Sequence, residues 1–142
     1  MITCFLIPGK PQGKARPRFN TTTKAVHTPL ATRQYEQTIR YAYLSSTTSG
    51  ERCHCGAVRV EIHAVFPVPK SWSKIKKSKA IAGEIMPETK PDADNISKAV
   101  LDALNGLAYK DDSQVIDLSV KKRYGEVGHV SVRIEDMEGG HK

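Results

Sequence analysis

The sequence lacks the features that mark secreted proteins and membrane proteins. Its 142 residues include only three cysteines (Cys4, Cys53 and Cys55), an odd number that is too small for a disulfide framework and favours a reducing, intracellular setting. No run of about 18 apolar residues is present, which excludes a membrane-spanning helix. The N-terminus has no basic segment ahead of its short apolar stretch, so it is not a signal peptide. We therefore expect a cytoplasmic protein.

Motifs of several common enzyme classes are also missing. The sequence has no Walker A phosphate loop, no G-x-S-x-G nucleophile elbow and no glycine-rich dinucleotide fingerprint, so we expect no organic cofactor. The Cys53-His54-Cys55 stretch has an unusual C-x-C spacing and no second cysteine pair, so a zinc site is disfavoured. The five histidines, His54 included, are interpreted as surface or strand residues, and none is assigned to catalysis.

Positive charge is in excess, and its distribution is uneven. Lysine and arginine number 22 against 15 aspartates and glutamates, which gives a formal net charge of +7. Two stretches, residues 1–35 and 66–83, contain basic residues and no acid, whereas five aspartates fall within residues 92–112. The basic stretches suit a phosphate backbone, which the aspartates would repel unless a cation lay between them. This conflict indicates a divalent-metal enzyme acting on nucleic acid; the simpler alternative is a solvated surface with chance clusters.

Hydrophobic periodicity predicts one α+β domain over residues 1–142, with a small mixed β-sheet packed against helices and a frayed tail from about residue 137. Alternating apolar residues predict strands over residues 2–7, 57–66, 116–121 and 130–135, with a hairpin turn at 125–128. Helical spacing predicts helices over residues 32–44, 71–82 and 94–107. Residues 9–29 are expected to form a long loop or a ragged hairpin, and residues 45–56 a surface loop.

Two of the five aspartates lie where a loop enters the third predicted helix. Asp92 and Asp94 can present oxygens to one hard cation such as Mg²⁺, and either can cap the helix. Asp111 and Asp112 precede the next strand and offer a third carboxylate for phosphodiester hydrolysis, although sequence alone does not bring it to the helix start. Lys98, four residues after Asp94, either serves the scissile phosphate or forms an i,i+4 ion pair, which for an isolated pair is the simpler interpretation.

The stretch from Lys90 to Val115, KPDADNISKAVLDALNGLAYKDDSQV, resembles the signature of the RusA-type Holliday junction resolvases, which are bacterial and prophage endonucleases. The resemblance includes the K-P-D-x-D-N start, the lysine at position 98, the D-A-L that follows and the final D-D-x-Q. It departs at Ile96, where leucine is usual. The segments GKPQGKARPRFN and HTP-x-x-T are also similar to the longer members of this family, so the resemblance covers most of the chain.

The resemblance implies a RusA-like fold and a homodimeric DNA endonuclease that recognises four-way junctions by their structure. Such an enzyme makes paired, symmetric nicks with Mg²⁺ or Mn²⁺ during DNA recombination and repair. The resemblance implies that Asp92, Asp94 and Asp112 hold the metal and that Lys98 is the catalytic lysine. The basic residues expected to contact phosphates, without reading bases, are Lys14, Arg16, Arg18, Lys70, Lys74, Lys76, Lys77 and Lys79.

Two other functions are compatible with the sequence. A non-catalytic nucleic-acid-binding module would account for the basic stretches but leaves the aspartates without a purpose. Nothing in the sequence excludes a broader metal nuclease that acts on flaps or forks. The sequence leaves open the preferred cleavage sequence, the number of metal ions and the dimer surface.

Overall fold

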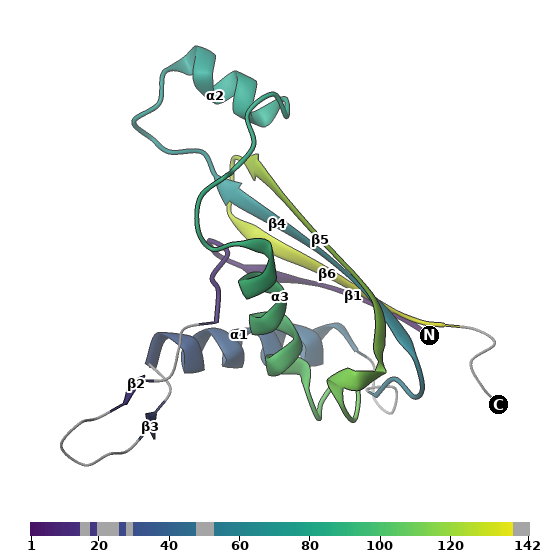
Figure 1. Cartoon of the computed structure of the whole chain (residues 1–142). Helices are drawn as coiled ribbons and strands as arrows, with labels where there is room; N and C mark the ends of the chain where they lie inside the picture. The colour runs from purple at the N-terminus through teal and green to yellow at the C-terminus, as the bar shows by residue number, and fades with distance from the viewer. Residues whose placement is uncertain (15–17, 20–25, 28–29, 48–52, 138–142) are drawn as a thin grey trace.

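In the computed structural model, which describes residues 1–14, 18–19, 26–27, 30–47 and 53–137, four strands form one mixed sheet (Figure 1). The strands are β1 (Ile2–Pro8), β4 (Val58–Pro67), β5 (Val115–Gly125) and β6 (His129–Asp136). Their order across the sheet is β1-β6-β4-β5. β6 pairs antiparallel with β1 and with β4, whereas β4 and β5 are parallel. The predicted α+β class with a small mixed sheet is confirmed.

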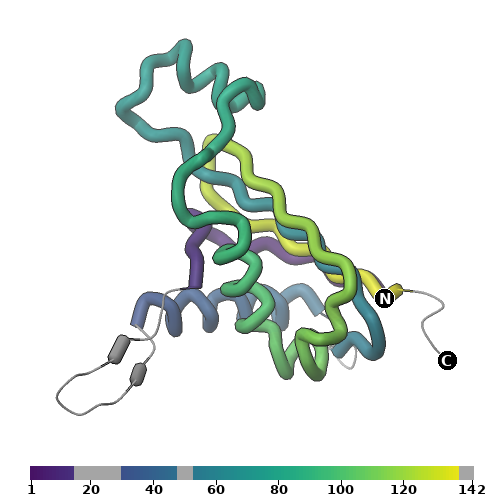
Figure 2. The backbone as a smooth tube through the Cα atoms, viewed as in Figure 1, coloured from purple at the N-terminus to yellow at the C-terminus, as the bar shows by residue number. Residues whose placement is uncertain are grey.

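Two helices, α1 (Leu30–Ser46) and α3 (Ala93–Leu104), cover one face of the sheet (Figures 1 and 2). α3 forms here because its apolar residues recur at three- and four-residue spacing, and Ile96, Val100 and Leu104 on that stripe have no exposed surface. Strands β1 and β6 and most of β4 contribute every second residue to the same core, as their alternating burial shows. Helices and sheet therefore share one hydrophobic core.

None of the described helices covers the opposite face of the sheet (Figure 1), which carries charged side chains. Arg133 of β6 lies 3.7 Å from Glu61 of β4 and 2.9 Å from Glu135 on its own strand. Arg59 of β4 pairs with Asp117 of β5 at 3.0 Å. Opposite charges on neighbouring strands support the register of the sheet.

The predicted elements are found near their expected positions, with differences in extent. The helix predicted over 94–107 ends at Leu104, and Gly106 just beyond it has a positive φ of 79°. Within the loop predicted over 9–29, β2 (Arg18–Phe19) and β3 (Val26–His27) pair antiparallel, as in the ragged hairpin alternative. α2 (Lys74–Ile81) lies within the helix predicted over 71–82. None of the described helices is long and apolar enough to cross a membrane. The tail beyond residue 137 lies outside the described part of the chain.

The expectation of a surface position is wrong for His54, which is only 1% exposed. Its Nε2 lies 2.9 Å from Oγ1 of Thr3, and its Nδ1 lies 2.6 Å from Oδ1 of Asp136. Its backbone N–H donates to the carbonyl of Ala108 at 2.7 Å. Because the side-chain partners lie 51 and 82 residues away in the sequence, the polar local sequence gives no sign that this histidine is buried.

Asp136 is an ionised partner of this buried ring. Burial raises the pKa of Asp136, but the hydrogen bond with His54 and the N-terminal ammonium of Met1, 3.3 Å away, lower it more. The net effect is a pKa below the ordinary value of aspartate. The three groups together join the two ends of the described chain to the loop before β4.

We predict that His54→Ala destabilises the fold. The substitution leaves a cavity and removes a partner from both Thr3 and Asp136, so the free energy of unfolding in denaturant titrations should fall by about 2–4 kcal/mol. His63→Ala is the matched control, because His63 is half-buried among the charged residues of β4 and should cost less than about 1 kcal/mol. Equal losses in the two variants would contradict a stabilising role for the hydrogen bonds of His54.

Candidate active site

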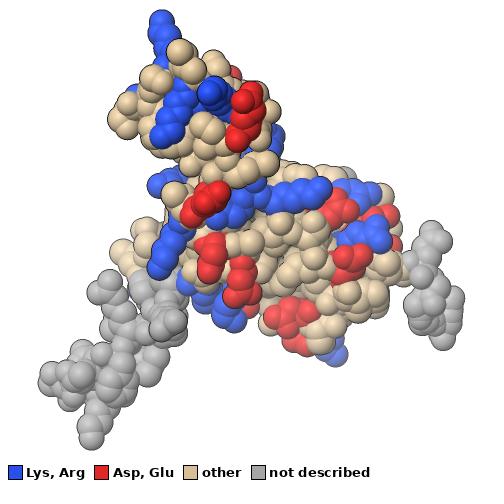
Figure 3. Space-filling model, turned by 45° about the horizontal axis from the view of Figure 1, so that its top comes forward, with Lys and Arg blue, Asp and Glu red and all other residues tan. Residues whose placement is uncertain are grey.

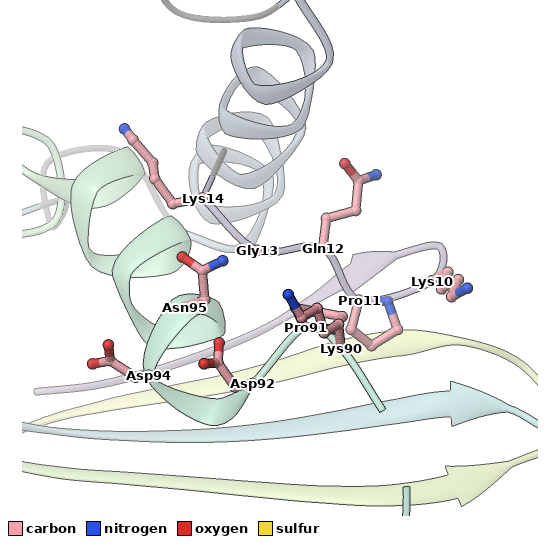
Figure 4. A pocket seen from close by; sticks show the side chains of 10 residues that line it. All are labelled: Lys10, Pro11, Gln12, Gly13, Lys14, Lys90, Pro91, Asp92, Asp94 and Asn95. Atoms are coloured by element: carbon pink, nitrogen blue, oxygen red, sulfur yellow. The ribbon is translucent and has the colours of Figure 1, made fainter. Parts of the chain in front are cut away.

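The first turn of α3 presents two carboxylates that do not serve the fold. Asp92 is the N-cap residue of the helix, yet its side chain accepts no capping hydrogen bond. Asp94 lies in the first turn, and its carboxylate makes no hydrogen bond or ion pair with the described residues. Figure 4 shows both side chains on this turn. A structural capping role therefore does not account for Asp92, and both carboxylates remain available to a cation.

The segment that follows β1 lies against the start of α3. The backbone N–H of Lys14 donates to the carbonyl of Asn95 at 3.3 Å. A Cβ on Gly13 would lie 2.6 Å from Nδ2 of Asn95 and 3.0 Å from Cβ of Pro91, so a side chain there would displace the Asn95 side chain and crowd Pro91. This close approach is the physical reason for glycine at position 13, the second glycine of the GKPQGK stretch.

An open hollow of about 710 Å³ lies between residues 10–14 and the start of α3. Asp92, Asp94 and Asn95 line it on the helix side, together with Lys10 and Lys90 (Figure 4). Ammonium groups beside carboxylates suit a ligand that brings both a cation and phosphate oxygens. Sequence reasoning missed Lys10 and Lys90 as site residues, although both were visible as cations in an acid-free stretch and in the K-P-D motif.

Lys98 lies one turn further along α3 and pairs with Asp102 instead of Asp94. Its Nζ lies 3.8 Å from Oδ2 of Asp102, which Nζ of Lys14 approaches to 3.3 Å. Lys14 also pairs with Glu36 of α1 at 2.5 Å. Since the Lys98 side chain is 62% exposed and its pairing is long, the ammonium can reach a phosphate.

Asp112 lies at the opposite end of α3 from the other two predicted metal ligands. Its backbone N–H donates to Oδ1 of Asn105, the C-cap residue of α3, at 2.9 Å. Because a helix rises about 1.5 Å per residue, Asn105 lies roughly 16 Å along the axis from Asp94. The structure therefore brings Asp92 and Asp94 together but does not bring Asp112 to them within one chain. Among the described residues, no group of three or more His, Cys, Asp and Glu side chains is placed to hold a metal ion.

The D-D-x-Q segment is fixed by its first and last residues. Oδ2 of Asp111 accepts the backbone N–H of Ser113 at 3.3 Å and caps the short helix η1 (Asp112–Gln114). Hydrogen bonds with the side chain and the backbone of Ser113 lower the pKa of Asp111. The side chain of Gln114 makes four backbone hydrogen bonds: two stay within its own segment, and two tie η1, and with it Asp112, to the loop before β4. The four partners are Lys110, Asp111, His54 and Gly56.

The predicted phosphate-binding residues of the N-terminal stretch are only partly described. Arg16 and the side chain of Arg18 lie outside the described part of the chain. Burial lowers the pKa of Lys14, but the hydrogen bonds and charges of Glu36 and Asp102 raise it more, so the ammonium is charged and already paired. Two carboxylates therefore already neutralise the charge that Lys14 would offer to a phosphate.

The other predicted phosphate-binding residues lie on residues 68–89, which we call the α2 arm. The arm projects from the end of the sheet where α3 begins, and lysine side chains gather on it (Figures 1 and 3). Nζ of Lys76 lies 4.1 Å from the centre of the Trp72 ring, so this lysine also orders the arm. The predicted phosphate contacts on the arm are Lys70, Lys74, Lys76, Lys77 and Lys79.

The residues of the hollow fit a hard divalent cation. Mg²⁺ binds one or two carboxylates, keeps several waters and shares oxygens of a substrate phosphate, and Mn²⁺ takes similar oxygen ligands. Asp92 and Asp94 supply two carboxylates that make no hydrogen bond or ion pair with the described residues, and Lys10 and Lys90 line the same hollow. The donor set suits a metal shared with substrate better than a cage built from protein alone.

Two comparisons with known proteins concern the chain as a whole. An uncharacterized protein of Bacillus subtilis (strain 168), YqaN, is 41% identical over 137 residues, which cover 94% of this chain and 95% of that protein. Residues 8–135 match the family described as endodeoxyribonuclease RusA, a span that includes the hollow, the α2 arm and all three predicted metal ligands. The chain therefore belongs to the RusA family of endodeoxyribonucleases.

Proposed function

We propose that the chain is a divalent-metal-dependent DNA endonuclease that resolves four-way (Holliday) junctions by paired, symmetric nicks in DNA recombination and repair. The observation that carries this proposal is one hollow lined by Asp92 and Asp94, whose carboxylates pair with none of the described residues, together with Lys10 and Lys90. The lysines of the α2 arm support binding to a phosphate backbone. A non-catalytic binding module would gain nothing from the carboxylates, which would repel the same phosphates.

The residues around the hollow divide the tasks of phosphodiester hydrolysis among them. Asp92 and Asp94 would hold Mg²⁺ or Mn²⁺, which when bound activates a water for in-line attack and stabilises the leaving oxygen. Lys10 and Lys90 would bind the phosphates of the strand and orient it in the hollow. Lys98 would place its exposed ammonium near the scissile phosphate, where negative charge builds up in the transition state.

Asp112 enters this proposal through a second copy of the chain. Within one chain, Asp112 lies beside Asn105 at the far end of α3, and Asn105 is roughly 16 Å along the helix axis from Asp94. In a homodimer whose two-fold axis sets the α3 helices antiparallel, the end of one helix lies beside the start of the other. The edge strand β5, which contacts α3, exposes Ile116 (63%) and Leu118 (43%) and so offers an apolar surface for such a dimer.

The first prediction from this proposal concerns one carboxylate, Asp92, and the lysine, Lys98. Asp92→Asn is expected to lower cleavage of a synthetic four-way junction by more than about 100-fold, because a metal ligand is lost. Lys98→Ala is expected to lower it by about 100- to 1,000-fold. Junction binding should persist in both variants and strengthen in Asp92→Asn, since repulsion of the phosphates falls. Single-turnover cleavage and gel-shift titrations measure the two effects.

Glu88→Gln is the matched control, because it removes one negative charge from an exposed residue in the loop before α3 and should change cleavage less than about two-fold. Chelation with EDTA should abolish cleavage by the wild type, and added Mg²⁺ should restore it. Cleavage by Asp92→Asn at the wild-type rate would show that the site is placed wrongly.

A second prediction separates junction resolution from the broader nuclease activities. At identical salt, a four-way junction should be cut at least about ten-fold faster than a fork or a continuous duplex, with nicks at symmetric positions on two strands. Equal cutting of the fork would favour a flap or fork nuclease. Binding without any Mg²⁺-dependent nicking would leave only the non-catalytic module.

A third prediction tests whether Asp112 acts across two copies. Asp92→Asn and Asp112→Asn chains are each expected to be inactive, but an equilibrated one-to-one mixture should recover about a quarter of the wild-type active sites. Half of its dimers combine one chain of each kind, and each such dimer holds one site with both wild-type residues. If the three aspartates act within one chain, the mixture stays inactive.

A further inference from the structure

The α2 arm carries an exposed isoleucine that neither the core nor the proposed active site uses. Ile75 is 72% exposed, although it is the second residue of α2 and stands between Lys74 and Lys76. The helix turns Ala80, which is 1% exposed, toward the rest of the protein. At about 100° per residue, Ile75 lies roughly 140° around the axis from Ala80 and only about 40° from Lys79. Ile75 is therefore an apolar side chain on the outward face of α2, next to Lys79.

Two segments connect α2 to the rest of the protein, and we call them the two legs of the arm. Both legs are hydrogen-bonded to β5, which holds Ile75 in a fixed position. The N–H of Val68 donates to the carbonyl of Gly125 at 3.1 Å in the first leg. Nζ of Lys122 donates to the carbonyl of Thr89 at 2.8 Å in the second leg. Trp72 packs edge-on against a tyrosine of β5, with ring centroids 5.3 Å apart. Few of these contacts would survive a hinge motion of the arm, so the isoleucine is presented by a rigid element.

The charge and the location of the arm both indicate that DNA is what lies against it. α2 contains four lysines and no acid. The arm leaves the body at the end where α3 begins, so DNA with a phosphate in the hollow at Asp92 approaches the arm as well (Figures 1 and 2). Among lysines that bind phosphates, Ile75 has no favourable contact with the backbone of DNA. Its apolar partner in DNA is the face of a base pair, which is accessible where stacking is interrupted.

We infer that Ile75 is a wedge that inserts at the branch point of the junction and determines the preference for branched over continuous DNA; this inference rests on the proposed function. Burial of one aliphatic side chain changes an equilibrium constant by about ten- to one-hundred-fold. Opening a stacked step inside a continuous duplex costs a comparable factor, so insertion there brings no net gain. At a branch point the stacking is already broken, and the burial of Ile75 adds to affinity.

Binding titrations in EDTA, where no strand is cut, test the wedge. Ile75→Ser is expected to weaken binding to a four-way junction by about ten-fold and to change duplex binding by less than two-fold. Ile81→Ser is the matched control: Ile81 is an exposed apolar residue of the same helix (47%) that lies about 120° around the axis from Ile75, and its loss should leave both affinities unchanged. Lys79→Ser should weaken junction and duplex binding alike and reduce the salt dependence by about one phosphate contact.

A fluorescent base analogue, 2-aminopurine, placed beside the branch point gives a second readout. The wild type should raise its emission through unstacking, and Ile75→Ser should not. Ile75→Met keeps an apolar side chain and should restore both the preference and the emission. The thermal melting of each variant checks the fold, which an exposed side chain should not disturb.

The outcomes distinguish the wedge from the proposed function. If Ile75→Ser keeps the wild-type preference, or weakens junction and duplex binding alike, the wedge is refuted and the proposed function stands. A wild type that binds junction and duplex equally would overturn both. A change in the sedimentation of free Ile75→Ser would place Ile75 in a contact between copies and would also refute the wedge.

Discussion

The packing of α3 on the sheet is the constraint on which the proposed site depends. Ile96, Val100 and Leu104 are completely buried, and this stripe sets both the axis and the rotation of the helix. The rotation turns the first-turn carboxylates away from the core and toward the hollow. The length of the helix separates them from Asp112 by a distance that no side chain spans. Because α3 is a rigid helix packed on the sheet, a site that uses all three aspartates has to be shared between two copies of the chain. Otherwise the site contains fewer aspartates than the motif suggests.

The charges around α3 divide the five-aspartate cluster into two kinds. Asp102 lies between the ammonium groups of Lys14 and Lys98, and Asp111 caps η1, so both serve the fold. The remaining three carboxylates are Asp92, Asp94 and Asp112, the same three that the family resemblance implies as metal ligands. A carboxylate that stabilises its own helix or loop is a poor candidate for a metal ligand, because binding the metal ion would break that stabilising contact. The division follows from hydrogen bonds and ion pairs, independently of the motif.

The sequence predicted most of the fold because its elements carry local signals. The alternation in β4 and the apolar stripe of α3 each lie within about a dozen residues, and both elements are found where periodicity places them. Contacts between distant segments left no such signal. The burial of His54 depends on Thr3 and Asp136, and the hollow depends on the approach of Gly13 to Asn95. The motif located the carboxylates, but only the packing of residues 10–14 on α3 shows that Lys10 and Lys90 accompany them.

Selectivity for a branched structure has to come from something other than the lysines. Attraction between ammonium groups and phosphates acts on every duplex, so it supplies affinity and positioning without discrimination. Discrimination needs elements that match a branch alone. In the proposed dimer, the two-fold relation between two sites would be one such element, since a continuous duplex cannot fill both sites in the same geometry. In the proposed wedge, a fixed apolar side chain on a basic arm would be another, since it gains contact area only where base pairs are already unstacked. The arm leads into the loop that carries Asp92, so a wedge on it would act next to the proposed site of cleavage.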